Sequence, residues 1–570
     1  MEKTSPSDNL MPGADCGGEV RDFGFIRGVA GEFTSESRDE ADRQARAMYT
    51  GFGSRRLAYL LQLVGLCCLL PAMSRASSTT WKGSAANLNW STSGNWSGGL
   101  PAPTSDVVFF TNGVVLTSAS NNVVSANTTI QSLSYTQTNP STGTQTYQNT
   151  YINSGVTLTV SNGLATNAIF VGSGLSLAGV ATTATISGPN GSLAVGATNG
   201  NINVRQGGSA DNYRAATLDL SGLSNCTVRA QRVLVAGDGT NGSAERDRES
   251  GTLKLARNNT LYLSSGSFPP ALTVGYTIGN GSGITSNLLV LGQTNYIYSD
   301  TGLSVGMGRN PSLMKFGGFA NSWVKFRDTL GTGRQSRWLI GDSSTLTYWG
   351  THGGGTNDFS GGTVDARVAL VVVGRSGITN TSGNLAAGGN DGALIMNAGT
   401  LDVNTMVVGY QMDNYSARVG GYVSVDGTAQ VLVNNAIQLG RFLGSAASNG
   451  VSSAILNIGT LTGGGTVTVN GSIATATSSK NTDNNSQVVV RNGGSLSVKG
   501  TIGPLSNFEL NNCTLSLDFG TGGNPTTAVC ATTNLATGAP VNLNIAGTGL
   551  IPGQIALIKY KNAPTGSGFG

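Results

Sequence analysis

The chain has 570 residues, of which 84 are glycine and 11% are charged, and its formal net charge is +4. Because the basic residues do not gather into a strongly positive segment, the sequence argues against nucleic-acid binding. High glycine content, and a repeated region without amphipathic helices, indicate an all-β protein built from short strands.

The N-terminal region contains the pattern of a secretory signal peptide. An apolar run from Leu57 to Leu70 follows Arg55 and Arg56, and small residues up to Ala76 suit a cleavage site. The run is shorter than the roughly 20 residues that a membrane span requires, so we interpret residues 48–76 as a cleaved signal. The sequence therefore predicts export, to the extracellular space or the outer cell surface, with no membrane span in the mature chain.

The first 47 residues do not fit this signal. They hold six basic and ten acidic residues and would place a long charged segment ahead of the apolar run. Met48 offers a shorter leader of the ordinary kind. We expect residues 1–47 to be a non-native or disordered extension, and translation to begin at Met48.

A tryptophan-rich segment, residues 77–125, follows the signal and contains Trp81, Trp90 and Trp96. Two interpretations apply: the indoles stack on sugar rings, or they cover the open apolar end of a repeat array. We favour the cap, because terminal repeats need a covered end and large aromatic side chains are more often packed than exposed.

Residues 126–550 repeat a short apolar strand that ends in glycine. The closing glycines are 31–38 residues apart, which indicates stacked coils with loops of unequal length. We predict a right-handed parallel β-helix; a β-propeller is the alternative, but its blades need about 40 residues or more. The repeated segments are Val233–Gly237, Leu272–Gly275, Leu303–Gly306, Trp338–Gly341, Val371–Gly374, Met406–Gly409 and Ile437–Gly440.

A second pattern places a glycine before alternating apolar and polar residues. In Gly399-Thr-Leu-Asp-Val403 the alternation predicts that Leu401 and Val403 face a dry core while Thr400 and Asp402 face water. The same pattern follows Gly251, Gly421, Gly465 and Gly494. The loops after the closing glycines, such as 238–250, 375–391 and 410–420, should emerge along one edge as solvated spacers.

The entry segment carries a series of motifs: Trp81-Lys-Gly83, Asn89-Trp90-Ser91, Gly94-Asn-Trp96-Ser-Gly-Gly99 and Asp106-Val-Val-Phe-Phe110. This series resembles the opening of bacterial autotransporter-associated β-strand repeat proteins, including those of the PEP-CTERM type. The resemblance implies a long β-solenoid carried to the cell exterior.

The chain departs from that family at its C-terminal end. Neither a membrane β-barrel nor an apolar sorting helix follows Gly570. We expect residues 551–570 to be the closing strand of a solenoid whose reading frame is truncated and whose anchor is missing.

The strongest candidate for ligand binding surrounds an outward tryptophan. Strand alternation places Val324 and Phe326 on the core face and the intervening residues on the other face. A tryptophan between cations suits a sugar that carries carboxylate or sulfate, although the cations can equally serve only to cover the indole. The candidate glycan-binding residues are Trp323, Lys325, Arg327 and Trp349.

Sequence motifs for catalysis or metal binding are weak. Asn481–Asp483 resembles one polygalacturonase segment without its companions, and Gly341–Ser344 with His352 resembles an esterase block without a complete triad. Gly354–Asp358 and Gly388–Asp391 resemble calcium-binding repeats that are not consecutive. We interpret all four segments as loops or turns and predict no catalytic residue, metal or cofactor.

Three cysteines follow the signal: Cys226, Cys513 and Cys530. The first two stand in Asn-Cys-Thr segments that look like equivalent strand positions. We therefore expect buried thiols rather than disulfides.

These patterns predict an exported structural or adhesin-like β-solenoid without catalytic activity, with extracellular polysaccharide as the candidate partner. Two alternatives remain open: a polysaccharide-active lyase or glycoside hydrolase, and a non-catalytic binder of acidic glycans.

Overall fold

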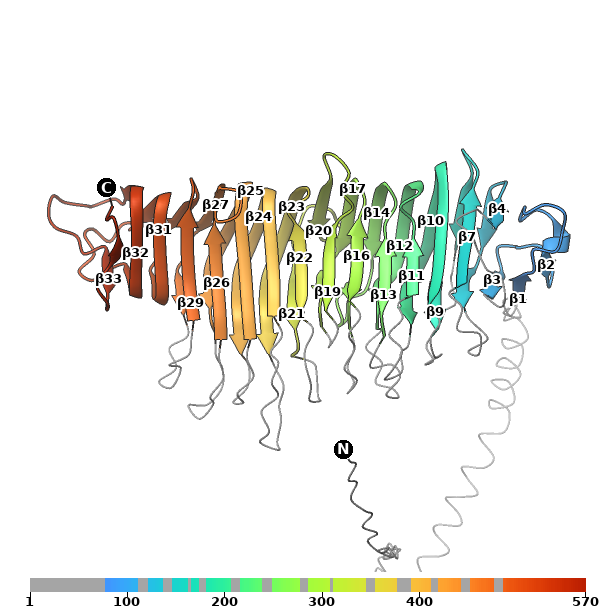
Figure 1. Cartoon of the computed structure of the whole chain (residues 1–570), viewed down its shortest axis with the longest axis horizontal. Coiled ribbons are helices and arrows are strands. Elements are labelled where there is room, and N and C mark those ends of the chain that lie inside the picture. The colour runs from blue at the N-terminus through green and yellow to red at the C-terminus, as the bar shows by residue number, and fades with distance from the viewer. Residues whose placement is uncertain are drawn as a thin grey trace, which may run out of the picture. The chain divides into compact units, whose positions relative to one another are not determined.

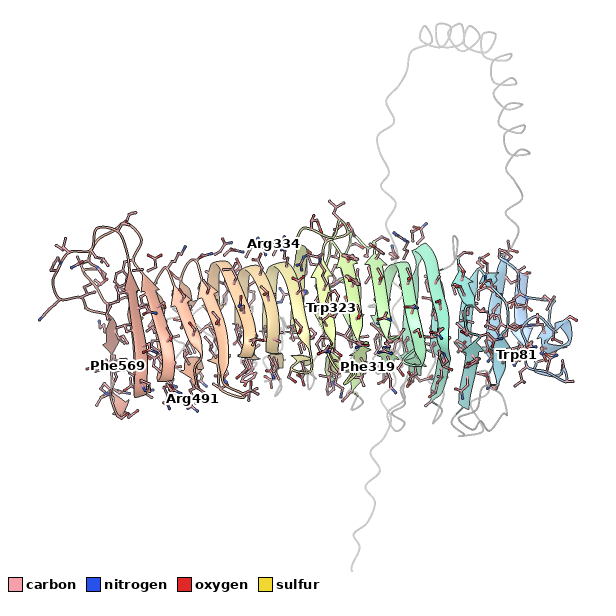
Figure 2. The ribbon with its side chains drawn as sticks, turned by 90° about the horizontal axis from the view of Figure 1, so that it is seen from above. Trp81, Phe319, Trp323, Arg334, Arg491 and Phe569 are labelled. Atoms are coloured by element: carbon pink, nitrogen blue, oxygen red, sulfur yellow. The ribbon has the colours of Figure 1, made fainter. Side chains whose placement is uncertain are left out.

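Short parallel strands stack along one axis to form a β-solenoid (Figure 1). The computed structural model describes residues 77–110, 121–136, 146–161, 166–173, 181–206, 216–237, 249–276, 286–307, 311–344, 354–376, 391–411, 419–441, 452–475 and 485–569. Trp81 and Phe569 lie at opposite ends of the stack (Figure 2). These residues include one 3-10 turn, η1 (Ser93–Asn95), and none of their segments is a helix long and apolar enough to cross a membrane.

The first strands are β1 (Ser77–Trp81), β2 (Trp96–Ser97), β3 (Ser105–Phe110), β4 (Asn122–Val124), β5 (Thr128–Ile130), β6 (Ser132–Thr136), β7 (Thr146–Ile152), β8 (Thr157–Val160), β9 (Asn167–Ser173), β10 (Thr182–Gln206), β11 (Ala216–Asp219) and β12 (Leu223–Val235). The middle strands are β13 (Gly251–Lys254), β14 (Asn258–Leu263), β15 (Leu272–Val274), β16 (Asn287–Leu291), β17 (Thr294–Ser299), β18 (Leu303–Val305), β19 (Ser312–Phe316), β20 (Trp323–Arg327), β21 (Gln335–Asp342), β22 (Gly355–Phe359), β23 (Thr363–Ser376) and β24 (Asp391–Gln411). The last strands are β25 (Val419–Leu439), β26 (Ser452–Ile458), β27 (Gly464–Val469), β28 (Ile473–Thr475), β29 (Asn485–Arg491), β30 (Ser495–Val498), β31 (Ile502–Asp518), β32 (Cys530–Ala546), β33 (Ile558–Tyr560) and β34 (Thr565–Gly566).

Three strands make one coil, and each strand pairs with its counterparts in the coils before and after. In the middle of the chain, β16 pairs with β13 and β19, β17 with β14 and β20, and β18 with β15 and β21, all in parallel. The walls that contain β16, β17 and β18 are called here the first, second and third sheets. Longer strands such as β24 bend from one sheet into the next. The predicted fold class, a parallel β-helix, is confirmed.

The pairing of strands between coils follows the repeat that the sequence predicts. The apolar residue that begins each repeated segment pairs with the corresponding residue of the next coil, along the third sheet. The paired column is Val233, Leu272, Leu303, Trp338, Val371, Met406 and Ile437. The spacing of the closing glycines in the sequence is therefore the length of one full coil.

The closing glycines make the corner at which each coil ends. Gly374 has φ +74°, a left-handed conformation that residues with a side chain rarely adopt. A Cβ atom at Gly374 would also overlap the carbonyl oxygen of Gly420, which lies in the first sheet two coils further along the chain. Most residues of the loops 238–250, 375–391 and 410–420, which follow such corners, lie outside the described residues.

Strand alternation buries one row of side chains inside the three sheets. Leu401 and Val403 are buried, as predicted, while Thr400 is exposed and Asp402 is partly exposed. The large rings of Phe326, Trp338 and Phe359 fill the middle coils, with centroids 4.9–6.1 Å apart. The main core is one continuous cluster along the stack.

The second sequence pattern does not mark a single sheet. Gly251 and Gly421 begin their alternation in the first sheet, whereas Gly399, Gly465 and Gly494 precede strand segments of the second sheet. Alternation is common to every wall of the coil, so it identifies strands without telling which wall they join.

The entry tryptophans pack at one end of the core. Trp90 and Trp96 are 2% and 3% exposed and meet edge to face, with centroids 5.3 Å apart. Trp90 Nε1 donates to Asn122 Oδ1 at 2.9 Å, and Phe109 contacts both indoles. Because these rings are packed against the first coils, their faces are not a free platform for sugars.

The three described cysteines are free and buried. Cys226 and Cys513 occupy the same column of the second sheet, as their sequence context predicts. Burial raises the pKa of the Cys226 thiol to about 12 and that of the Cys530 thiol to about 12.

We expect the folded protein to protect Cys226 and Cys530 from alkylation at pH 8. The thiolate is the reactive form, and a pKa near 12 leaves almost none of it at that pH. Iodoacetamide labelling followed by mass spectrometry of the two peptides tests this. Urea-unfolded protein is the control and should be labelled fully; equal labelling of the native chain would contradict the burial.

Candidate functional site

The outer face of the second sheet carries a cluster of aromatic and basic side chains on neighbouring coils. We call the set Arg229, Tyr262, Tyr296, Tyr298, Trp323 and Lys325 the aromatic strip. In register, Arg229 pairs with Tyr262 and Tyr262 with Tyr298, while Tyr296 pairs with Lys325. Trp323 lies on the same face, between Phe319 and Arg334 in the view from above (Figure 2).

Alternation along β20 explains why Trp323 and Lys325 face outward. Val324 and Phe326 are fully buried in the core, as the sequence predicts, and Trp323 and Lys325 are only partly buried. The same alternation along β17 buries Ile297 and turns Tyr296 and Tyr298 outward. The strip is thus the outward half of an ordinary solenoid wall.

The rings of the strip contact one another from coil to coil. Tyr262 and Tyr298 stack with centroids 4.8 Å apart and planes 20° apart, and the Arg229 guanidinium lies 4.3 Å from the Tyr262 centroid. Trp323 meets Tyr296 at 4.8 Å, with planes 82° apart. The tyrosine faces therefore cover one another, whereas Trp323 is turned out of the stack.

Arg327 does not present a free charge on this face. It is 6% exposed, and its guanidinium forms an ion pair with the Asp365 carboxylate. Its Nη1 also donates to the carbonyl oxygens of Phe326 at 2.8 Å and Asp365 at 2.9 Å. Of the two cations predicted to flank Trp323, only Lys325 makes no ion pair with another described residue.

Trp349, the fourth predicted glycan-binding residue, lies outside the described residues. The remaining tryptophan of this region, Trp338, is fully buried, and its Nε1 donates to Gln335 Oε1 at 2.9 Å. The aromatic-rich part of the sequence is therefore divided between the core and the outer face.

The carboxylates beside the strip have structural partners. Arg334 donates to Asp402 Oδ1 at 2.7 Å and to the Asp402 carbonyl oxygen at 2.6 Å, across an intervening coil. Burial acts to raise the pKa of Asp402, but hydrogen bonds from Arg334 and Asn434 outweigh it and lower that pKa. Asp365 and Asp402 thus hold coils together, and neither is a free acid or base.

Sequence segments with a faint catalytic resemblance give no assembled site in the described part of the chain. Asp342 is fully buried and accepts from Arg375 and from the Ser344 backbone N–H, as a structural turn does. Asn481–Asp483 and His352 lie outside the described residues. Among the residues that are described, His, Cys, Asp and Glu form no group of three that could hold a metal ion.

Sequence reasoning missed Arg229 and the three tyrosines of the strip. The available signal was the alternation of β14 and β17, which turns Tyr262, Tyr296 and Tyr298 outward. Tyr262 and Tyr298 are 36 residues apart, one coil, but that match becomes visible only once the register is known.

Comparison with models of known families, with curated protein sequences and with solved structures finds no match to this chain.

Proposed function

We propose that this protein is a non-catalytic, adhesin-like β-solenoid that acts outside the cell and binds acidic polysaccharide through the aromatic strip. The observation that carries the proposal is the set of outward rings on three successive coils, bordered by Arg229 and Lys325. Neither cation forms an ion pair with another described residue. An indole beside Lys325, with a second cation at the far end of the row of rings, suits a glycan that carries negative charge.

The absence of catalysis is proposed from the state of the carboxylates. Polysaccharide cleavage requires paired carboxylates, or a base with charge stabilisation, next to the substrate. Close to the strip, Asp365 and Asp402 are both engaged by arginines. Because these two carboxylates are held by arginines, the face that carries the aromatic strip supports ligand binding rather than bond cleavage.

Action outside the cell is proposed from the sequence. The apolar run before Ala76 has the form of an export signal, and the entry motif resembles that of autotransporter-associated β-strand repeat proteins.

We expect the double variant Trp323→Ala, Lys325→Ala to bind oligogalacturonate or a sulfated glycan at least about tenfold more weakly than the parent, because it loses both the ring and the charge. Calorimetry measures the affinity, and an assay for newly formed sugar ends detects any cleavage. Binding should also weaken as salt is raised, since exposed charges are screened.

Arg337→Ala is the matched control, because Arg337 is an exposed cation on the third sheet. It should bind as the parent does. Equal binding by the double variant would overturn the role of the strip, and release of sugar ends would replace the adhesin with the competing hypothesis of a polysaccharide-active enzyme.

A further inference from the structure

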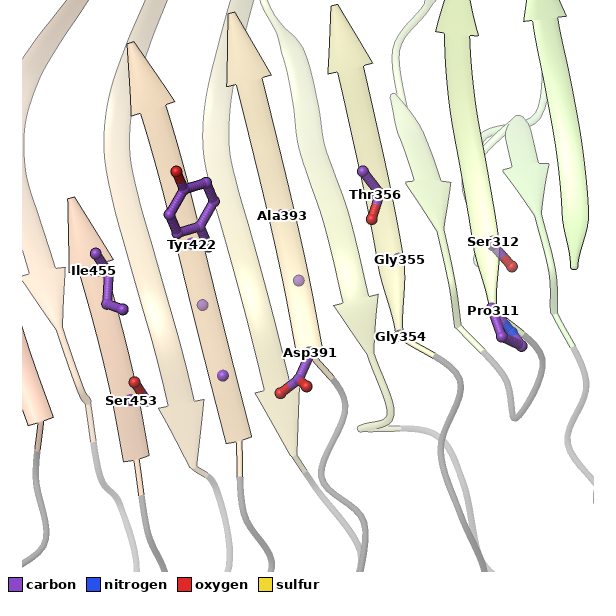
Figure 3. A pocket seen from close by; sticks show the side chains of 13 residues that line it. Pro311, Ser312, Gly354, Gly355, Thr356, Asp391, Ala393, Tyr422, Ser453 and Ile455 are labelled. Carbon is purple, nitrogen blue, oxygen red and sulfur yellow. The ribbon is translucent and has the colours of Figure 1, made fainter. Parts of the chain in front are cut away.

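A groove of about 330 Å³ lies on the first sheet, away from the aromatic strip. It crosses successive coils near the start of β19, β22, β24, β25 and β26 (Figure 3). Pro311 and Ser312 line one end, Ser453 and Ile455 line the other, and Tyr422 lies between. The volume is in the range of sites that bind small organic ligands.

The groove is hollow because the outward residues that pair with Tyr422 and Asp391, namely Ala393 and Gly420, are small. The glycines between these outward positions are buried and form the floor of the groove. Gly355, Gly392 and Gly421 are in register on three consecutive coils. A Cβ atom at each would overlap the backbone nitrogen of the closing glycine of the third sheet, for example that of Gly374 beside Gly392.

Tyr422 supplies an aromatic surface at this hollow. It pairs in register with Ala393, and Figure 3 shows its ring broadside, lying along the sheet. Asn457 Nδ2 donates to the Tyr422 hydroxyl at 3.2 Å and so holds the ring. Unlike Tyr262 and Tyr298, Tyr422 has no aromatic partner among the described residues.

Asp391 supplies the only charge among the described residues that line the groove. Its carboxylate is exposed, lies over Gly420, and makes no ion pair with another described residue. Asp391 is one strand across and two residues along from Tyr422, so their Cα atoms are about 8 Å apart. One ligand unit can therefore reach the ring and the carboxylate together.

We propose that this groove binds a neutral sugar unit of a glycan. The apolar face of the sugar packs on Tyr422, its hydroxyls donate to the Asp391 carboxylate, and the glycine floor lets the ligand approach the backbone. A negatively charged sugar is repelled by Asp391, so the preference is opposite to that of the aromatic strip. The inference does not depend on the function proposed for the strip.

The test uses the full chain and three soluble probes: neutral hexose tetrasaccharides (cello-, manno- and galacto-), oligogalacturonate, and oligomeric glucosamine. Saturation-transfer NMR should show at least one neutral tetrasaccharide bound at concentrations up to about 10 mM. Ala393→Tyr, which fills the hollow with a side chain, should weaken that binding at least about tenfold.

Ile395→Tyr is the matched control, because Ile395 faces outward on the same strand but does not line the groove. It should bind within about twofold of the parent. The double variant Trp323→Ala, Lys325→Ala should also bind the neutral probe normally, which separates this site from the strip.

Three results would overturn the inference. No neutral tetrasaccharide binds; or Ala393→Tyr, with an unchanged circular dichroism spectrum, binds as the parent does; or only the cationic glucosamine oligomer binds, which would make Asp391 a simple cation contact. Asp391→Asn adds a second readout, because removal of the charge should reduce the discrimination against oligogalacturonate at this groove.

Discussion

Replacing Gly374 with alanine should lower the urea midpoint of unfolding sharply. The left-handed backbone at φ +74° costs a residue with a Cβ about 1–2 kcal/mol. The new methyl group would also overlap the Gly420 carbonyl oxygen, and both atoms belong to strands fixed by neighbouring coils. The backbone must shift to relieve the overlap, so we expect a total loss of about 3 kcal/mol or more.

Gly318→Ala separates the two contributions. Gly318 has φ +80°, close to that of Gly374, but nothing lies within 4 Å of the position of its Cβ atom. This variant should lose only the conformational part, about 1–2 kcal/mol. Similar midpoints for the two variants would show that the close approach of coils at the corner does not contribute.

The second large effect should come from the buried ion pair at the same corner. Asp342 is fully buried, and Arg375 Nε donates to Asp342 Oδ1 at 2.7 Å while Nη2 pairs with Oδ2. Burial acts to lower the pKa of Arg375, but the hydrogen bond and charge of Asp342 outweigh it and raise that pKa. Arg375→Met leaves the Asp342 carboxylate buried without a counter-charge, which typically costs about 3–5 kcal/mol.

The double variant Asp342→Leu, Arg375→Met gives the informative comparison. If the cost arises from an unpaired buried charge, removal of both charges should restore most of the stability that Arg375→Met loses. Chemical denaturation of the parent, the single variants and the double variant completes the cycle. A double variant as unstable as the sum of the singles would place the cost in lost packing instead.

Both predictions concern the corner between the third and first sheets, and the groove lies on the outer face of the first sheet next to that corner. At Gly306, Gly341 and Gly374, which close coils of the third sheet, a Cβ atom would overlap a backbone carbonyl oxygen at the start of a first-sheet strand: that of Gly354, Asp391 and Gly420, respectively. The hollow beside Tyr422 lies on the outer side of this corner, where the outward residues Ala393 and Gly420 are small. A substitution that widens the corner should alter the groove as well as stability.

The sequence by itself determined the repeat and the direction of most side chains. Each coil must bury a row of apolar side chains against the coils beside it, so each repeat in the sequence consists of a short apolar strand and a closing glycine. For this reason the column from Val233 to Ile437 and the burial of Val324 and Phe326 were predictable. These features depend on the alternation of apolar and polar residues and on the left-handed backbone of the closing glycine. Both can be recognised within one repeat of the sequence.

Only the tertiary structure decided which outward side chains become neighbours. Residues paired between coils are separated by loops of unequal length, and irregularities such as that between Met396 and Ala398 shift the register within a strand. Arg327 is not a free cation because it is paired with Asp365, which is 38 residues away in the sequence. Likewise, Tyr262 stacks on Tyr298 because the register pairs these two residues, which are 36 positions apart. Coil-to-coil contacts of this kind arise when strands align about 4.8 Å apart, and no local pattern encodes that alignment.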